Sequence, residues 1–107
     1  MLLSQVKQLL DQTLSAENFR NEIAAETTAY EKVYRDKETT IPVYLKEDIY
    51  YLFTEEHYRC LDELYNTGKL KTHELSYICD ALSLSEMTLY EDDALPGKIE
   101  QLVITKL

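Results

Sequence analysis

The segment from residue 44 to residue 65, YLKEDIYYLFTEEHYRCLDELY, decides the fold that the sequence predicts. Tyrosines and carboxylates alternate in it at steps of four and three residues, which places them on one face of an α-helix. The members of this Tyr/acid stripe are Tyr44, Asp48, Tyr51, Glu55, Tyr58, Asp62 and Tyr65. Apolar residues such as Ile49, Leu52 and Leu64 are centred on the opposite face. We therefore predict one continuous amphipathic helix over residues 43–66.

Two alternatives stay open for this segment. Thr54, followed by Glu55-Glu56-His57, is also typical of a residue that caps a new helix, and a break there would divide the segment. The tyrosines, in turn, either form a surface for a partner or half-bury their rings under a neighbouring helix with their hydroxyls in water.

The rest of the chain predicts a single all-α domain over residues 1–107, a bundle of four to five helices. Only two Gly and two Pro interrupt 107 residues, which favours helices over a sheet. Ser15 is the expected cap of the second helix, Pro42 opens the third, and Gly68 ends it. The expected helices cover residues 2–14, 16–35, 43–66, 73–83 and 96–106. Residues 84–95 stay unassigned, because Met87–Tyr90 also fits an extended segment.

Charge limits the classes of partner. Twenty Asp and Glu oppose eleven Lys and Arg, for a formal net charge of -9. Nucleic acids and anionic membranes both attract basic surfaces, so we expect neither as a partner. An acidic protein instead suits a basic protein, since long-range attraction speeds their encounter.

Catalytic and metal sites are not indicated by the sequence. It contains neither a glycine-rich phosphate loop nor an HExxH motif, and we expect no enzyme activity and no cofactor. His57, Cys60, His73 and Cys79 have a spacing that superficially resembles a zinc site, but His73 and Cys79 fall on different faces of the expected fourth helix. We predict buried, reduced thiols, no bound metal and, since the first residues form an amphipathic helix rather than a signal peptide, a cytoplasmic protein.

The chemistry of the Tyr/acid stripe suits a cationic protein surface. Tyrosine gives a large, rigid contact area, and carboxylates accept charge-assisted hydrogen bonds from Arg and Lys. The same combination recurs at a second place. Its members are Tyr90, Glu91, Asp92 and Asp93.

Two short stretches resemble bacterial toxin-immunity proteins. The residues Leu2-Leu3, Val6 and Leu9-Leu10, followed by Leu14–Phe19, are similar to the first two helices of the colicin D type of helical immunity protein, over about a quarter of the chain. Asp48-Ile49-Tyr50-Tyr51 is similar to the acidic, paired-tyrosine recognition segment of nuclease-colicin immunity proteins. That resemblance implies Asp48, Tyr50 and Tyr51 as partner anchors. In that family, however, the pair lies on a short helix that proline ends, whereas Leu52-Phe53 continue the helix predicted here.

The resemblance implies a small, catalytically inert protein that protects a cell by covering the basic substrate cleft of a toxin, such as a nuclease, with the Tyr/acid stripe. Such a chain is expected to be a monomer outside the complex, because stacking the stripe on itself would bring carboxylates together. The alternative is a helical adaptor or regulatory domain that binds a different partner in an apolar groove.

Overall fold

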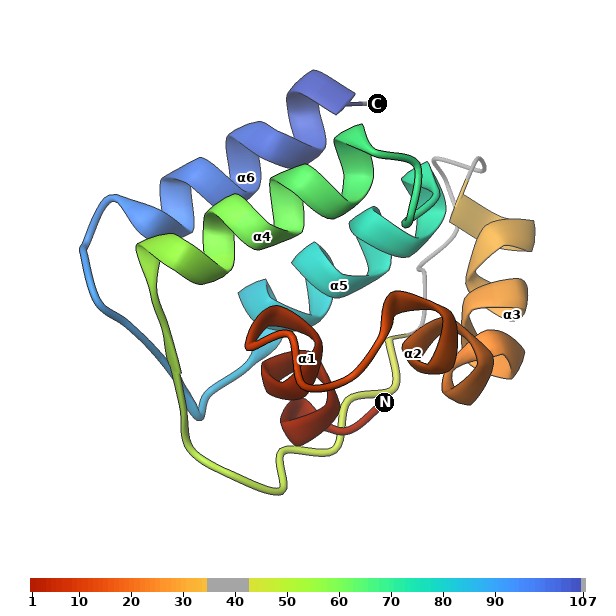
Figure 1. Cartoon of the computed structure of the whole chain (residues 1–107), viewed down its shortest axis with the longest axis horizontal. Helices are drawn as coiled ribbons and strands as arrows, with labels where there is room; N and C mark the ends of the chain where they lie inside the picture. Colours follow the sequence, from red (N-terminus) through yellow and green to blue (C-terminus); the bar gives the residue numbers. More distant parts are fainter. Residues whose placement is uncertain (35–42, 107) are drawn as a thin grey trace.

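The computed structural model of the chain describes residues 1–34 and 43–106. Within these residues it has six helices and one small sheet, packed around a shared core (Figure 1). The helices are α1 (Leu3–Leu10), α2 (Ala16–Glu22), α3 (Ala24–Tyr34), α4 (Glu55–Asn66), α5 (Thr72–Leu84) and α6 (Leu95–Lys106). The strands are β1 (Tyr51–Phe53) and β2 (Thr88–Tyr90). The fold is therefore mostly helical, as predicted, but the described residues form six helices where four to five were expected, and they add a two-stranded sheet that an all-α fold lacks.

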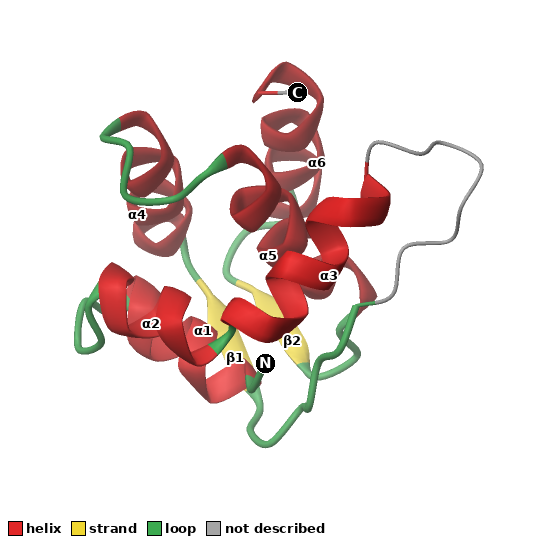
Figure 2. Ribbon diagram, turned by 90° about the vertical axis from the view of Figure 1, so that its right-hand side faces the viewer, coloured by secondary structure: helices red, strands yellow, loops and turns green. Residues whose placement is uncertain are grey.

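The sheet joins two segments that are far apart in the sequence. The strands β1 and β2 run parallel, with Tyr51 beside Thr88, Leu52 beside Leu89 and Phe53 beside Tyr90. Parallel strands need a crossover connection, which here consists of α4 and α5. Figure 2 shows the two strands side by side in the lower middle of the view, with α4, α5 and α6 above them.

The largest departure from prediction is in residues 43–66, where the continuous helix is wrong and the break at Thr54 is right. Residues 43–50 are irregular and extended, β1 follows, and only α4 is helical. The hydroxyl of Thr54 accepts a hydrogen bond from the amide of His57 at 3.2 Å. Because Thr54 has extended backbone dihedrals, it ends the strand and caps the helix at once.

The N-terminal helices are shorter than predicted. Helix α1 ends at Leu10, and Gln12 takes a left-handed conformation, with φ of 63°, in the turn that follows. The predicted helix over 16–35 is divided at Ile23, which separates α2 from α3; residue 35 lies outside the described residues. Ser15 caps α2 as predicted, its hydroxyl accepting from the amide of Asn18.

The second half of the chain agrees better with the sequence. Helices α5 and α6 match the predicted ranges to within one residue at each end, and Met87–Tyr90 is largely strand β2. Gly68 has a φ of 78° just after α4, the left-handed stop that was predicted. None of the helices in the described ranges is both long and apolar enough to cross a membrane.

The core lies between the helices and the inner face of the sheet. Tyr51 and Phe53 point into it and are 1% and 0% exposed. They meet leucines from α1 and α5, including Leu3 and Leu75. The opposite face of the same strands is thereby left on the outside of the molecule.

Candidate functional site

The Tyr/acid stripe does not exist as a single surface in the structure. Thr54 divides it into an extended part, with Tyr44, Asp48 and Tyr51, and a helical part that belongs to α4. Tyr51 is a core residue, and burial raises the pKa of its hydroxyl far above the usual value. A buried tyrosine offers nothing to a partner, so Tyr51 is excluded from the binding residues that the sequence predicted.

The first half of α4 directs its stripe residues toward α6. The Nζ atom of Lys98 donates to both carboxylate oxygens of Glu55 at 3.1 Å, and lies 5.7 Å from the centre of the Tyr58 ring. Burial, followed by the charge of Asp62, raises the pKa of the Tyr58 hydroxyl. Glu55 and Tyr58 thus join α4 to α6, and like Asp62 they are only partly exposed.

Two further predicted tyrosines also pack internally. The hydroxyl of Tyr65 is hydrogen-bonded to that of Thr72 at 3.0 Å, which links α4 to α5. Tyr90 donates to the carbonyl of Leu82 at 3.3 Å, and its ring lies 5.8 Å from that of Phe53. The rings of Tyr58, Tyr65 and Tyr90 are therefore partly buried, but the hydroxyls of Tyr65 and Tyr90 bond within the protein and not only to water as the alternative for the stripe expected.

The exposed counterpart of the predicted stripe lies on the outer side of the sheet. Tyr50, Leu52 and Leu89 are 78%, 52% and 61% exposed, whereas Tyr51 and Phe53 between them are buried. Leu52 and Leu89 are direct neighbours across the strand pair and so share one side, and Tyr50, one residue before β1, continues the alternation of exposed and buried residues. We call this set, Tyr50, Leu52 and Leu89, the sheet face.

Carboxylates lie in sequence at both ends of the sheet face. Asp48 is two residues before Tyr50, Glu91 is two residues after Leu89, and Asp93 follows; all three are exposed. Residues 46–56 and 87–95 together contain a single basic residue, Lys46. Their acidic residues are Glu47, Asp48, Glu55, Glu56, Glu91, Asp92 and Asp93.

Several of these carboxylates already have structural roles. Asp48 accepts hydrogen bonds from the amide and the hydroxyl of Ser4 at the start of α1, and these bonds lower its pKa against the opposing effect of burial. A hydrogen bond from Ser85, with a second from the amide of Met87, lowers the pKa of Glu47. Within the part of the chain that the structure describes, Glu56, Glu91 and Asp93 are the acids of this set whose side chains make no such bond, so they are available to a partner.

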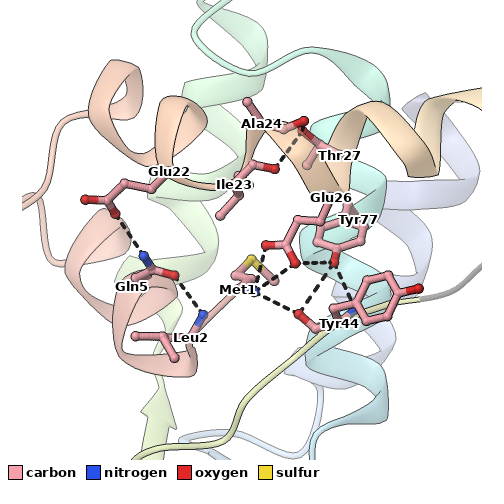
Figure 3. A network of polar contacts seen from close by, with 10 residues as sticks. All are labelled: Met1, Leu2, Gln5, Glu22, Ile23, Ala24, Glu26, Thr27, Tyr44 and Tyr77. Atoms are coloured by element: carbon pink, nitrogen blue, oxygen red, sulfur yellow. Dashed lines mark hydrogen bonds and ion pairs between the residues drawn. The ribbon is translucent and has the colours of Figure 1, made fainter.

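A polar network fixes the backbone at Tyr44 (Figure 3). The amino group of Met1 donates to the carbonyl of Tyr44 and to the carboxylate of Glu26, both at 2.9 Å. The hydroxyl of Tyr77 accepts from the amide of Tyr44 at 2.9 Å and donates to Glu26 at 3.0 Å. Burial raises the pKa of Tyr77 to about 12, so this hydroxyl keeps its proton. The ring of Tyr44 points away from the network and is 61% exposed.

A second network fixes the junction between β1 and α4. The Nδ1 atom of His57 accepts from the amide of Thr54 at 3.2 Å and is hydrogen-bonded to the Tyr51 hydroxyl at 3.0 Å. Its Nε2 atom therefore carries the proton and donates to Asp11 at 2.5 Å. Both ring nitrogens are thus used within the protein, and the direction in which the chain leaves β1 is set by this histidine.

Metal and nucleophile sites find little support in the geometry. Among the described residues, no group of three or more His, Cys, Asp or Glu side chains is arranged to hold a metal ion. Cys60 and Cys79 are free thiols. Burial raises the pKa of both, that of Cys79 to about 12, so they stay protonated and weakly nucleophilic.

Comparison with known proteins gives no relative from which a role could be transferred. No family model, no curated protein and no solved structure matches this chain. The case for a function therefore depends on its own surface.

Sequence reasoning missed Leu52 and Leu89 as surface residues. Leu52 was placed on the buried side of the predicted helix, and Leu89 in an unassigned segment. The signal that could have found them is the run Ile49-Tyr50-Tyr51-Leu52-Phe53 directly before a capping threonine, which is typical of a short strand. Of the predicted binding residues, the structure leaves Tyr44, Asp48, Tyr50 and the acids of residues 91–93 clearly exposed.

Proposed function

We propose that this chain is an inhibitory binding protein that covers a basic surface of a bacterial toxin domain, in the manner of an immunity protein. The observation that carries the proposal is the sheet face: three large exposed apolar side chains in one place, with carboxylates at both ends. Single exposed apolar residues are ordinary, but a contiguous group on a strand pair favours a contact surface.

The composition of this surface favours a basic protein as the partner. Tyr50, Leu52 and Leu89 supply area that gains free energy when it leaves water, at about 25 cal/mol per Å². Glu91 and Asp93 would pair with Lys or Arg at the edge of that contact. The net charge of -9 adds long-range attraction, which raises the association rate.

A toxin is the class of basic partner that the sequence favours. The segment Asp48–Tyr51 is similar to the recognition segment of nuclease-colicin immunity proteins. Of its two tyrosines, Tyr50 is the exposed one and Tyr51 is buried. The proposed mechanism is occlusion, in which the chain blocks access to the cleft of the toxin and performs no chemistry itself. We infer a cytoplasmic site of action and a monomer outside the complex.

The alternative function is an adaptor that binds a non-toxin partner in a groove. One observation favours it: an open groove of 480 Å³ between α5, β2 and α6, lined in part by Leu82, Tyr90 and Pro96. The two functions predict a different dependence of the association rate on ionic strength. Raising the ionic strength should slow association with a basic toxin strongly, and binding in an apolar groove only slightly.

The decisive experiment uses the protein encoded by the reading frame next to that of this chain. Expressing its C-terminal domain alone should arrest growth, and expressing this chain with it should restore growth. The double variant Glu91→Lys, Asp93→Lys should fail to restore growth. The control Glu17→Lys, Glu63→Lys changes the net charge equally on exposed residues of α2 and α4, and should protect fully.

Two outcomes would contradict the proposal. If the neighbouring domain does not arrest growth, or arrests it even when this chain is present, the chain is not the inhibitor of that domain as a toxin. If the Glu91→Lys, Asp93→Lys variant protects cells as well as the control does, the sheet face with its flanking carboxylates is not the binding surface. Circular dichroism of both double variants checks that each still folds.

A further inference from the structure

The outer edge of β1 is unpaired among the described residues. The amide of Tyr51 donates to the carbonyl of Met87, and the carbonyl of Phe53 accepts from the amide of Glu91, both at 3.0 Å. In a parallel ladder, residues that bond to the neighbouring strand alternate with residues that face the other way. Tyr50 and Leu52 therefore direct their amides and carbonyls away from β2.

The residues that carry these edge groups are exposed. Tyr50 and Leu52 are the exposed residues of the segment, at 78% and 52%. Within the ranges that the structure describes, no hydrogen bond from another element reaches the amide or carbonyl of either residue. The next group on this edge, the amide of Thr54, is already taken by His57, which limits the free edge to the stretch before it.

We propose that the outer edge of β1 receives an extended, basic segment of the partner protein as a third strand of the sheet. This inference rests on the proposed function and states how the partner is bound. Main-chain hydrogen bonds to Tyr50 and Leu52 hold the segment, and its outward side chains enlarge the sheet face. Exposed edges of this kind pair readily with other chains.

Charge selects a basic segment as the occupant. Asp48, which is exposed although it is bonded to Ser4, precedes the free edge, and the exposed Glu56 follows it, so an added strand ends near a carboxylate on both sides. Lysine or arginine at the ends of the segment, with an apolar residue beside Leu52, matches this arrangement. A second copy of this chain does not, because pairing β1 with itself would bring the same acids together at a net charge of -9 per chain.

The test uses the full chain and a synthetic peptide that alternates lysine and valine over about seven residues, which spans about 23 Å when extended. Two derivatives carry N-methyl groups on alternate residues, one on the lysines and one on the valines. An added strand bonds through one of its edges only, so one derivative should bind at least about tenfold more weakly while the other binds like the parent. A glutamate–valine peptide should not bind.

The same titration reports on the protein side. Amide hydrogen exchange at Tyr50 and Leu52 should slow in the complex, whereas that at Tyr51 should change little. Leu52→Pro removes the edge amide without removing a bond to β2 and should abolish peptide binding. Leu52→Ala keeps that amide and controls for the lost side chain.

Several results would overturn strand addition. They are equal binding of both methylated derivatives, absence of binding by the parent peptide at millimolar concentration, unchanged exchange at Leu52, and self-association of the chain through β1. If Leu52→Pro still protects cells against the toxin domain while Glu91→Lys, Asp93→Lys does not, the proposed function is retained and strand addition at β1 is rejected. If both variants protect, the proposed function falls with it.

Discussion

Replacing Thr54 with alanine tests whether a helix begins at that residue. In the structure the Thr54 hydroxyl accepts from the amide of His57 at 3.2 Å, and losing such a cap costs about 1 kcal/mol. If residues 43–66 instead formed one helix, Thr54 would be interior, and Thr54→Ala would stabilise the protein by about 0.5 kcal/mol through helix propensity. The two arrangements thus predict opposite signs.

The measurement is the free energy of unfolding from urea denaturation, followed by far-UV circular dichroism. Thr54→Ala should lower that free energy, and should lower the melting temperature by about 4–8 °C for each kcal/mol lost in a domain of this size. Thr54→Ser retains a hydroxyl that accepts the same bond and should stay close to the parent. An unchanged or raised free energy of unfolding in Thr54→Ala would refute the assignment of the cap.

Three further predictions follow from burial and titration. Tyr51→Ala should cost about 3–5 kcal/mol of unfolding free energy because its ring is in the core, whereas Tyr50→Ala should change it by less than about 0.5 kcal/mol; equal effects in urea denaturation would contradict the strand. A hydrogen bond from Lys7, opposed by burial and assisted by His57, lowers the pKa of Asp11 in the folded state. The Asp11 carboxylate therefore stabilises the folded state above its unfolded-state pKa of about 3.9, and this contribution is lost as pH falls toward its lower folded-state pKa. In urea denaturation below about pH 4, Asp11→Asn should therefore lose less unfolding free energy than the parent does. Burial raises the pKa of Cys79 to about 12, so iodoacetamide at mildly alkaline pH should modify it only on unfolding, and mass spectrometry that finds rapid modification in the folded protein would contradict its burial.

The helices with regular apolar spacing were predictable from the sequence, because their local pattern and their burial agree. Helices α5 and α6 follow this rule, and so do the capping by Ser15 and the stop at Gly68. Ile23 divides the predicted second helix although the apolar spacing continues across it. A pattern of side chains does not report a local change of backbone direction.

Residues 43–53 could not be assigned correctly from periodicity alone. In the predicted helix Tyr51 and Phe53 fall on opposite faces, whereas in a strand they share one face, and a stretch of so few residues fits both descriptions. What decides the matter is a tertiary partner: β1 forms because β2 lies beside it, and β2 comes from residues 88–90. The predicted site changed for the same reason, because the strand pairing buries Tyr51 and exposes Leu52 and Leu89, which the prediction did not include.

The parallel pairing of β1 with β2 makes the sheet face a late product of folding. The two strands are separated in the sequence by α4 and α5, so their pairing is non-local, and we expect such a pairing to form slowly. A nascent or clipped chain that lacks residues 88–90 would still contain Tyr50 and Leu52 but would have no β2 to hold them in line. We therefore expect a partner that recognises the sheet face to bind the intact, folded chain and not a fragment that lacks β2.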